Sequence, residues 1–197
     1  MDQNTINTYN ELAKEYDEET ADFWDRFPRT FLDKFIELAR GNVLDVGSGP
    51  GRDGLILQNH GLAVTCLDAS EKMIALSREK ELISVLGDFA RLPFPDESFD
   101  NIWAYTSLLH VPKSEIEKTL LEIKRVLKPN GYFALGLIEG DTELYLESSG
   151  VNQPRWFSFY RKEEIKKLLS TTGFKIAYFE SFVPKSKNYL NFIAIKK

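Results

Sequence analysis

The chain has 197 residues, a net charge of −5 at pH 7 and 43% hydrophobic residues. This length fits one domain with a substantial core, and the composition excludes a disordered chain. The acidic balance argues against nucleic acid as a partner, because proteins that bind polyanions usually carry a basic excess. No apolar run approaches the roughly 18 residues of a membrane helix, and the polar start lacks a leader pattern. We therefore expect a cytoplasmic protein without a membrane span.

The charge is distributed unevenly along the chain. Residues 1–25 hold eight acidic side chains and one Lys, whereas residues 160–197 hold nine Lys or Arg and three Glu. Two solvated faces explain this distribution, and a basic patch for an anionic substrate is the alternative. The single cysteine, Cys66, lies in an apolar run and is expected to be a small buried side chain. No metal site is expected.

Predicted elements begin with two N-terminal helices. Apolar residues recur at helical spacing from Tyr9 to Tyr16 and from Phe31 to Ala39, where Gly41 would form the C-cap. Strands and helices then alternate. The predicted strands, apolar almost throughout, are 42–46, 62–68, 83–88, 99–105, 132–138, 174–180 and 189–197. The helices between them are 52–59, one that Ser70 caps, 114–127 and 161–171, and residues 139–158 predict a loop or lid.

This alternation predicts a Rossmann-like α/β fold: a doubly wound, seven-stranded, mostly parallel sheet with helices on both faces. About eight residues separate the last two strands. A parallel crossover needs a dozen or more, so the last strand should be antiparallel. We expect one domain over residues 1–197, with cap helices in 1–40 and the sheet in 41–197. Ligands in such sheets bind at the carboxyl ends of the strands.

The stretch VLDVGSGPGRDG, residues 43–54, runs from the first strand into a glycine-rich turn. The glycines from Gly49 to Gly54 match the dinucleotide fingerprint G-x-G-x-x-G, which would indicate an NAD-dependent oxidoreductase. From Asp45 to Gly51 the same stretch also spells D-x-G-x-G-x-G. The second pattern fits better, because a carboxylate beside a pyrophosphate costs about 1 kcal/mol or more at ~4 Å.

Carboxylates end three successive predicted strands. Asp45 suits an ammonium or a sulfonium group. Asp68, seventeen positions after Gly51, suits two ribose hydroxyls, and Asp88 with the adjacent ring of Phe89 suits an adenine. Together these residues indicate an adenosine ligand with a cationic tail, which is S-adenosylmethionine.

These residues resemble those of the class I S-adenosylmethionine-dependent methyltransferases, especially the small-molecule group that includes ubiquinone and menaquinone biosynthesis enzymes. The similar segments, over about residues 40 to 180, are VLDVGSGPG, LDASEKMI, GDFARLPFPDESFDNIWAYTSLLHV, EIKRVLKPNGYFAL and EEIKKLLSTTGF. The resemblance implies S-adenosylmethionine as the cofactor and a cap helix that places Tyr9 or Tyr16 over the pocket. The cofactor-binding residues it implies are Asp45, Gly47, Ser48, Gly49, Gly51, Asp68, Ala69, Met73, Asp88, Phe89, Ala104 and Tyr16.

His110 follows the fourth strand, where the resemblance places the pocket wall. It is the candidate catalytic residue, as a general base for a hydroxyl or amine, and a structural histidine bonded to a loop carbonyl is the alternative. Trp103 and Tyr105 share one face of a strand and are expected in the core, with substrate stacking as the alternative. Residues 156–157 are candidates for a lid, and Arg155 for contact with an anionic substrate.

The sequence therefore predicts transfer of a methyl group from S-adenosylmethionine to a small-molecule acceptor by in-line displacement. One alternative is a methyltransferase-fold protein that acts on RNA or protein, or that binds without catalysis. Its support is the basic C-terminal third of the chain. A more remote alternative is an NAD-dependent oxidoreductase.

Overall fold

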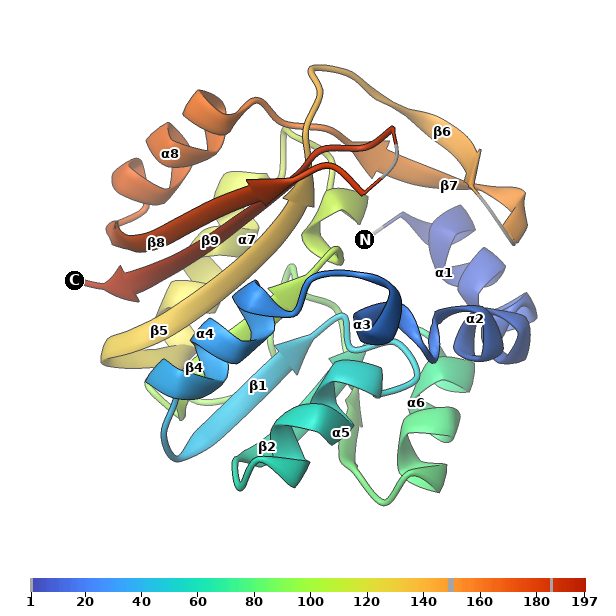
Figure 1. Cartoon of the computed structure of the whole chain (residues 1–197), viewed down its shortest axis with the longest axis horizontal. Helices are drawn as coiled ribbons and strands as arrows, with labels where there is room; N and C mark the ends of the chain where they lie inside the picture. The colour runs from blue at the N-terminus through green and yellow to red at the C-terminus, as the bar shows by residue number, and fades with distance from the viewer. Residues whose placement is uncertain (1, 149–150, 185) are drawn as a thin grey trace.

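A computed structural model of the chain describes residues 2–148, 151–184 and 186–197. Within these ranges, seven strands form the central sheet in the order β3-β2-β1-β4-β5-β9-β8 (Figure 1). Their bounds are β1 Asn42–Val46, β2 Ala63–Asp68, β3 Ile83–Leu86, β4 Phe99–Tyr105, β5 Leu127–Ile138, β8 Phe174–Phe182 and β9 Tyr189–Lys196.

Helices cover both faces of this sheet. They are α1 Gln3–Glu11, α2 Ala13–Thr20, α3 Phe23–Arg26, α4 Thr30–Leu38, α5 Arg52–Asn59, α6 Glu71–Glu79, α7 Ile116–Val126 and α8 Lys162–Thr171, with a 3-10 turn, η1, at Leu108–His110. Buried side chains of α7 and α8 belong to the hydrophobic core on one face. Those of α3, α4 and α5 belong to the core on the other face. The predicted doubly wound fold is confirmed.

Strand β1 pairs in parallel with both β2 and β4, and β9 pairs antiparallel with both β5 and β8. The predicted antiparallel last strand is therefore confirmed. Because β1, β2 and β4 are parallel, their carboxyl ends meet at one edge of the sheet. The glycine-rich turn lies at this edge, directly after β1.

Two local predictions are wrong. Gly41 does not cap α4, because the helix ends at Leu38 and Ala39 is already extended. Gly41 instead turns the chain into β1 at a φ of +76°, where a Cβ would overlap the Asp100 carboxylate. Most of segment 139–158 is not a loop but an antiparallel hairpin of β6, Glu143–Ser148, and β7, Val151–Ser158, outside the main sheet (Figure 1). Residues 149–150 of that segment lie outside the described ranges.

The first predicted helix is two helices, α1 and α2, which separate at Leu12 with φ −111° and ψ 23°. Both contact α6. Asn10 of α1 accepts a hydrogen bond from the Ser70 hydroxyl at 2.8 Å, and Asp17 of α2 pairs with Lys80 at 2.7 Å. Ser70 itself caps α6, as predicted, by accepting from the amide of residue 73. The N-terminal helices are thus fastened beside the carboxyl edge of the sheet.

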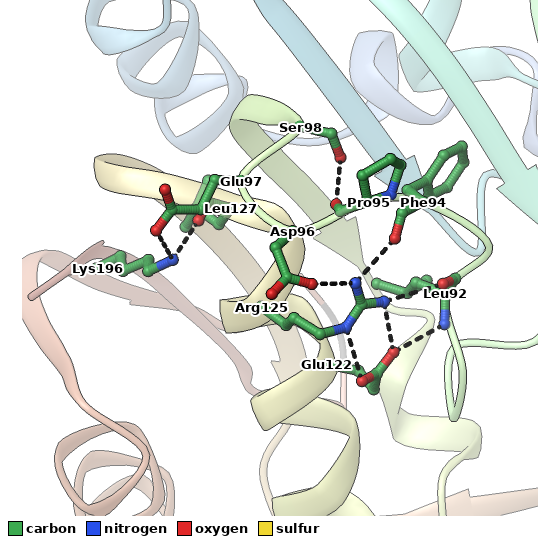
Figure 2. A network of polar contacts seen from close by, with 10 residues as sticks. All are labelled: Leu92, Phe94, Pro95, Asp96, Glu97, Ser98, Glu122, Arg125, Leu127 and Lys196. Atoms are coloured by element: carbon green, nitrogen blue, oxygen red, sulfur yellow. Dashed lines mark hydrogen bonds and ion pairs between the residues drawn. The ribbon is translucent and has the colours of Figure 1, made fainter.

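Arg125, near the end of α7, fastens the loop between β3 and β4 (Figure 2). Its guanidinium donates to the carbonyl oxygens of Leu92 and Phe94 at 3.0 and 2.8 Å and pairs with Asp96 at 2.8 Å. The same loop carries Phe89, which is buried. Arg125 therefore holds a segment that contributes to the carboxyl edge of the sheet.

Replacing this guanidinium should loosen the loop. We expect Arg125→Ala to lower the free energy of unfolding by about 2 kcal/mol, because charge-assisted hydrogen bonds to backbone carbonyls are lost. Urea denaturation followed by circular dichroism measures the change. The control is Arg29→Ala, since Arg29 pairs with Asp33 at 3.5 Å on a more exposed surface. We expect this variant to lower the free energy of unfolding by at most about 0.5 kcal/mol. Equal losses in the two variants would contradict the role assigned to Arg125.

Candidate active site

A cavity lies at the carboxyl ends of β1, β2 and β4. The turn after β1, the end of β2, the turn after β4 and the N-terminal helices all contribute to its lining. The predicted cofactor residues found there are Tyr16, Asp45, Gly47, Ser48, Gly49, Asp68, Met73 and Phe89. The fold thus brings together side chains that are up to 73 positions apart in the sequence.

Four of the predicted cofactor residues do not line this cavity: Gly51, Ala69, Asp88 and Ala104. Gly51 begins α5 at a φ of +84°, and a Cβ there would lie 2.5 Å from the Leu82 side chain. This glycine therefore serves the turn and its packing. Asp88 is half-buried, and its Oδ1 accepts from the amide of Ala90 at 2.9 Å.

Ala104 is fully buried in the sheet core, so its side chain does not reach the cavity. Tyr105 and the turn after it line the cavity instead. Trp103 is fully buried, as predicted, and Tyr105 stacks on it with ring centroids 5.6 Å apart. Tyr105 therefore has one face in the aromatic core and also reaches the candidate site.

The glycine-rich turn is tied to β2 by its backbone. The amides of Gly47 and Ser48 donate to the carbonyl of Leu67 at 2.7 and 3.0 Å, and the amide of Gly49 donates to Asp68 Oδ2 at 2.9 Å. Gly47 has a φ of +69°, and a Cβ there would overlap the Ser107 side chain. Glycine is required at this position both by its conformation and by the close approach of the turn after β4.

Asp45 and Asp53 lie in this site with opposite electrostatic environments. Asp45 Oδ2 is buried and has no hydrogen-bond partner among the described residues. Burial and the negative charge of Asp53 raise the pKa of the Asp45 carboxyl well above its usual value. An unpaired buried carboxylate oxygen is costly, and a cationic donor in the cavity would relieve that cost.

Asp53, in contrast, is fully surrounded by donors. It accepts from the indoles of Trp24 at 2.7 Å and Trp103 at 2.9 Å, and it pairs with Arg52 at 2.7 Å. Burial opposes the charged form, but these contacts outweigh it and lower the pKa of the Asp53 carboxyl. Since its donors come from α3, α5 and β4, Asp53 joins the N-terminal helices to the sheet.

Each carboxylate oxygen of Asp68 accepts a hydrogen bond from a backbone amide. Oδ1 accepts from the amide of Ser70 at 2.8 Å, and Oδ2 accepts from Gly49 at 2.9 Å. Burial raises the pKa of this carboxyl. Each carboxylate oxygen has a second lone pair, so the pair can still accept hydrogen bonds from a ligand in the cavity that Asp68 lines.

Sequence reasoning missed Thr106, which lines the cavity directly after β4. Its φ is +54°, and its amide donates to the carbonyl of Gly136 at 2.9 Å. A β-branched residue rarely adopts this left-handed conformation, and such outliers cluster at functional sites. No residue pattern signals it, because sequences of this kind normally place Gly or Asn at positive φ. Ser107, also missed, bonds the carbonyl of Val46 at 2.6 Å.

His110 stands at the centre of a chain of hydrogen bonds. Its Nδ1 lies 2.5 Å from the carbonyl oxygen of Trp156 and must donate to it, so Nε2 accepts from the hydroxyl of Tyr9 at 2.8 Å. The Tyr9 oxygen in turn accepts from Arg155 at 2.8 Å. Burial lowers the pKa of His110 to about 3, which keeps the ring neutral. Both ring nitrogens are engaged in this conformation, as expected of the structural alternative.

Helix α1 and strand β7 lie side by side and form a cover over the site (Figure 1). The amide of Trp156 donates to the Thr5 hydroxyl at 2.9 Å, and Gln153 bonds Glu11 at 2.7 Å. His110 bonds both halves of this cover, through Tyr9 on α1 and through Trp156 on β7.

Comparison with known proteins agrees with this geometry. Residues 44–135 match the profile of the methyltransferase domain family. This segment is similar to methyltransferase domains. The match agrees with the predicted family, the class I S-adenosylmethionine-dependent methyltransferases, and with S-adenosylmethionine as the predicted cofactor.

Curated relatives align over part of the chain. Demethylmenaquinone methyltransferase of Symbiobacterium thermophilum is 33% identical over 144 residues, which cover 64% of this chain and 55% of that protein. Sterol 24-C-methyltransferase of Gibberella zeae is 40% identical over 104 residues, which cover 47% of this chain and 26% of that protein. The chain thus spans less than two thirds of the length of either relative.

Solved structures show the same fold over nearly the whole chain. DhpI in complex with SAH has a TM-score of 0.80 at 22% identity, covering 98% of this chain and 95% of that one. The 1,6-didemethyltoxoflavin-N1-methyltransferase of Burkholderia thailandensis has a TM-score of 0.74 at 20% identity, covering 98% and 88%. Within the described ranges, the chain has no helix with the length and apolar character needed to cross a bilayer.

The two buried carboxylates Asp45 and Asp53 predict opposite mutational effects. We expect Asp45→Asn to raise the melting temperature of the ligand-free protein, because it removes a charge that the fold disfavours. We expect Asp53→Asn to lower the free energy of unfolding by about 3 kcal/mol, because it breaks a buried ion pair and turns a donor toward an indole N–H. Thermal and urea unfolding at pH 7 measure both. A loss of stability in both variants would show that Asp45 has a partner in solution.

His110 predicts a pH dependence of stability. Its folded pKa of about 3 lies below the usual histidine pKa of 6.5, so between these values the unfolded chain binds a proton that the folded chain does not. The stability that the buried neutral His110 contributes is therefore fully present above pH 6.5 and is lost progressively as the pH falls below that value. Between pH 7 and 5 we expect the native protein to lose about 2 kcal/mol more than His110→Gln. Urea unfolding of both proteins across this range measures the difference, and parallel losses would contradict a buried neutral His110.

Proposed function

We propose that the chain transfers a methyl group from S-adenosylmethionine to a small-molecule acceptor. The observation that carries this proposal is the buried, unpartnered Oδ2 of Asp45 beside the glycine-rich turn. A cofactor tail with an ammonium group would supply the missing donor. Asp68 would accept from the ribose hydroxyls, and the buried side chains of Met73 and Phe89 would flank the adenine.

The charge of the cavity lining favours S-adenosylmethionine over a dinucleotide as the ligand. A Cβ at Gly54 would lie 2.7 Å from the sulfur of Cys66, so this glycine allows α5 to pack closely on β2. The third glycine of a dinucleotide fingerprint has the same role. The glycines therefore do not discriminate. Asp45, Asp53 and Asp68 all line the cavity; Arg52 neutralises Asp53, and a pyrophosphate there would still face the other two carboxylates. A cationic ligand is attracted by the same arrangement.

A second cavity, of about 360 Å³, adjoins the first and is the proposed acceptor site. The residues that line both cavities are Tyr9, Tyr16, Thr20, Arg52, Thr106 and His110. They mark the boundary where donor and acceptor would meet. An acceptor held within a cavity under the cap of α1 and α2 favours a small molecule over a macromolecule.

In the proposed mechanism the chain works mainly by alignment. S-adenosylmethionine supplies a methyl group already activated on a sulfonium. The residues at the boundary of the two cavities would hold the acceptor in line with that group and exclude water, and such positioning contributes up to roughly 7–11 kcal/mol in the best cases. His110 would act by positioning Tyr9 and the cover, since both of its ring nitrogens are engaged.

Calorimetric titration with S-adenosylhomocysteine tests the cofactor assignment. We expect micromolar binding, with no binding of NADH as the control. Asp68→Asn should weaken S-adenosylhomocysteine binding at least tenfold, because one oxygen that would accept from the ribose becomes a donor. A change within twofold would overturn the ribose assignment, and preferential binding of NADH would overturn the proposed function.

A further inference from the structure

The cap helices α1 and α2 are held against the domain mainly by polar contacts. Among the described residues of these two helices, the buried ones are Thr5, Thr8 and Ala13. None of these is a large apolar side chain, whereas most helices dock by burying an apolar face. The position of the cap therefore depends on the hydrogen bonds and ion pairs that join it to the rest of the domain.

Lys80, directly after α6, joins the cap to the glycine-rich turn. Its ammonium donates to Asp17 Oδ1 of α2 at 2.7 Å and to the carbonyl oxygen of Pro50 at 2.8 Å. Pro50 lies in the turn between Gly49 and Gly51 and lines the first cavity. One side chain thus bridges a cap helix and the turn that would hold the cofactor.

This bridge fixes the part of α2 that carries Tyr16, the neighbour of Asp17. The Tyr16 ring lies over the glycine-rich turn, since a Cβ built on Gly49 would be 3.8 Å from its Cε1. Tyr16 lines both cavities, and its ring meets that of Tyr9 edge-on with the centroids 5.4 Å apart. Rotation or withdrawal of α2 would therefore move Tyr16 away from the turn.

The ion pair in this bridge is accessible to solvent. The side chains of Lys80 and Asp17 are 26% and 25% exposed, so dissolved salt can screen their attraction. At the other end of α6, Asn10 of α1 accepts from the Ser70 hydroxyl at 2.8 Å and from the amide of Lys72 at 3.2 Å. This second tether is uncharged, so the Lys80 bridge is the one that salt would weaken.

We propose that Lys80 is a positioning residue for S-adenosylmethionine. It holds α2 so that Tyr16 stays over the glycine-rich turn, and it thereby slows dissociation of the cofactor from a cavity that both the turn and Tyr16 line. This inference rests on the proposed function for the identity of the ligand, whereas the bridge between cap and turn exists without a ligand.

Release of S-adenosylhomocysteine tests this role. Lys80→Met keeps the aliphatic stem and removes the donor group, and we expect it to raise the dissociation rate about fivefold with a matching loss of affinity. Surface plasmon resonance measures the rate, and calorimetry measures the affinity. The matched control is Lys128→Met, because Lys128 also pairs with an aspartate, Asp100, at 2.7 Å, but near the amino end of β4. This control should change neither quantity, and equal effects of the two variants would overturn the proposal.

Three further measurements separate positioning from a general loss of stability. Lys80→Arg, which keeps a cation with several donors, should restore the native dissociation rate. Asp17→Ala should raise that rate in the native protein but not in Lys80→Met, because both changes remove the same contact. Added NaCl should raise the dissociation rate of the native protein more than that of Lys80→Met. Additive effects of the two substitutions, or an equal salt dependence in both proteins, would contradict the role of the ion pair.

The two proposals fail in different ways. If S-adenosylhomocysteine does not bind the native protein, the proposed function is rejected, and hydrogen exchange of the free protein still tests the bridge. Lys80→Met should then speed exchange of the α2 amides, whereas Lys128→Met should not, and unchanged exchange in Lys80→Met would overturn the inference. If S-adenosylhomocysteine binds but both variants release it at the same rate, only the positioning role is rejected.

Discussion

The parallel pairing of β1 with both β2 and β4 is the constraint on which the rest of the site depends. Parallel strands that point the same way bring their carboxyl ends to one edge. The glycine-rich turn, Asp68 and Thr106 therefore meet although they are far apart in the sequence. The turn is then locked by β2, through the Leu67 carbonyl and the Asp68 carboxylate. The cavity follows from strand direction before any ligand is considered.

Electrostatics divides the carboxylates at this edge into two kinds. Asp53 is satisfied by two indoles and Arg52, and it holds the N-terminal helices against the sheet. Asp45 lines the same cavity, and its buried Oδ2 has no hydrogen-bond partner among the described residues. A buried polar atom without a partner costs stability, and proteins retain such a cost where a ligand offsets it. The difference between these two neighbouring carboxylates would favour a cationic group of a ligand beside Asp45.

The cover and the acceptor cavity are linked through His110. The chain of hydrogen bonds from Arg155 through Tyr9 and His110 to the Trp156 carbonyl joins the second cavity, the N-terminal helix and the hairpin. An acceptor in this cavity would therefore contact the same residues that join the two halves of the cover. Alignment and exclusion of water would be achieved by one connected network.

The sequence by itself determined which segments form strands and which chemical groups follow them. The apolar runs, the glycine-rich turn and the carboxylates at strand ends are local patterns that tertiary contacts do not override. The sequence did not indicate the hairpin of residues 143–158, which was expected to be a loop or lid, because the segment lacks a periodic pattern that would distinguish a strand from a loop. Only the tertiary structure decided which carboxylate is paired and that Thr106 adopts a positive φ. It also decided that His110 is held between the two halves of the cover. These properties depend on contacts with residues from distant segments of the chain, and local sequence patterns do not specify such contacts.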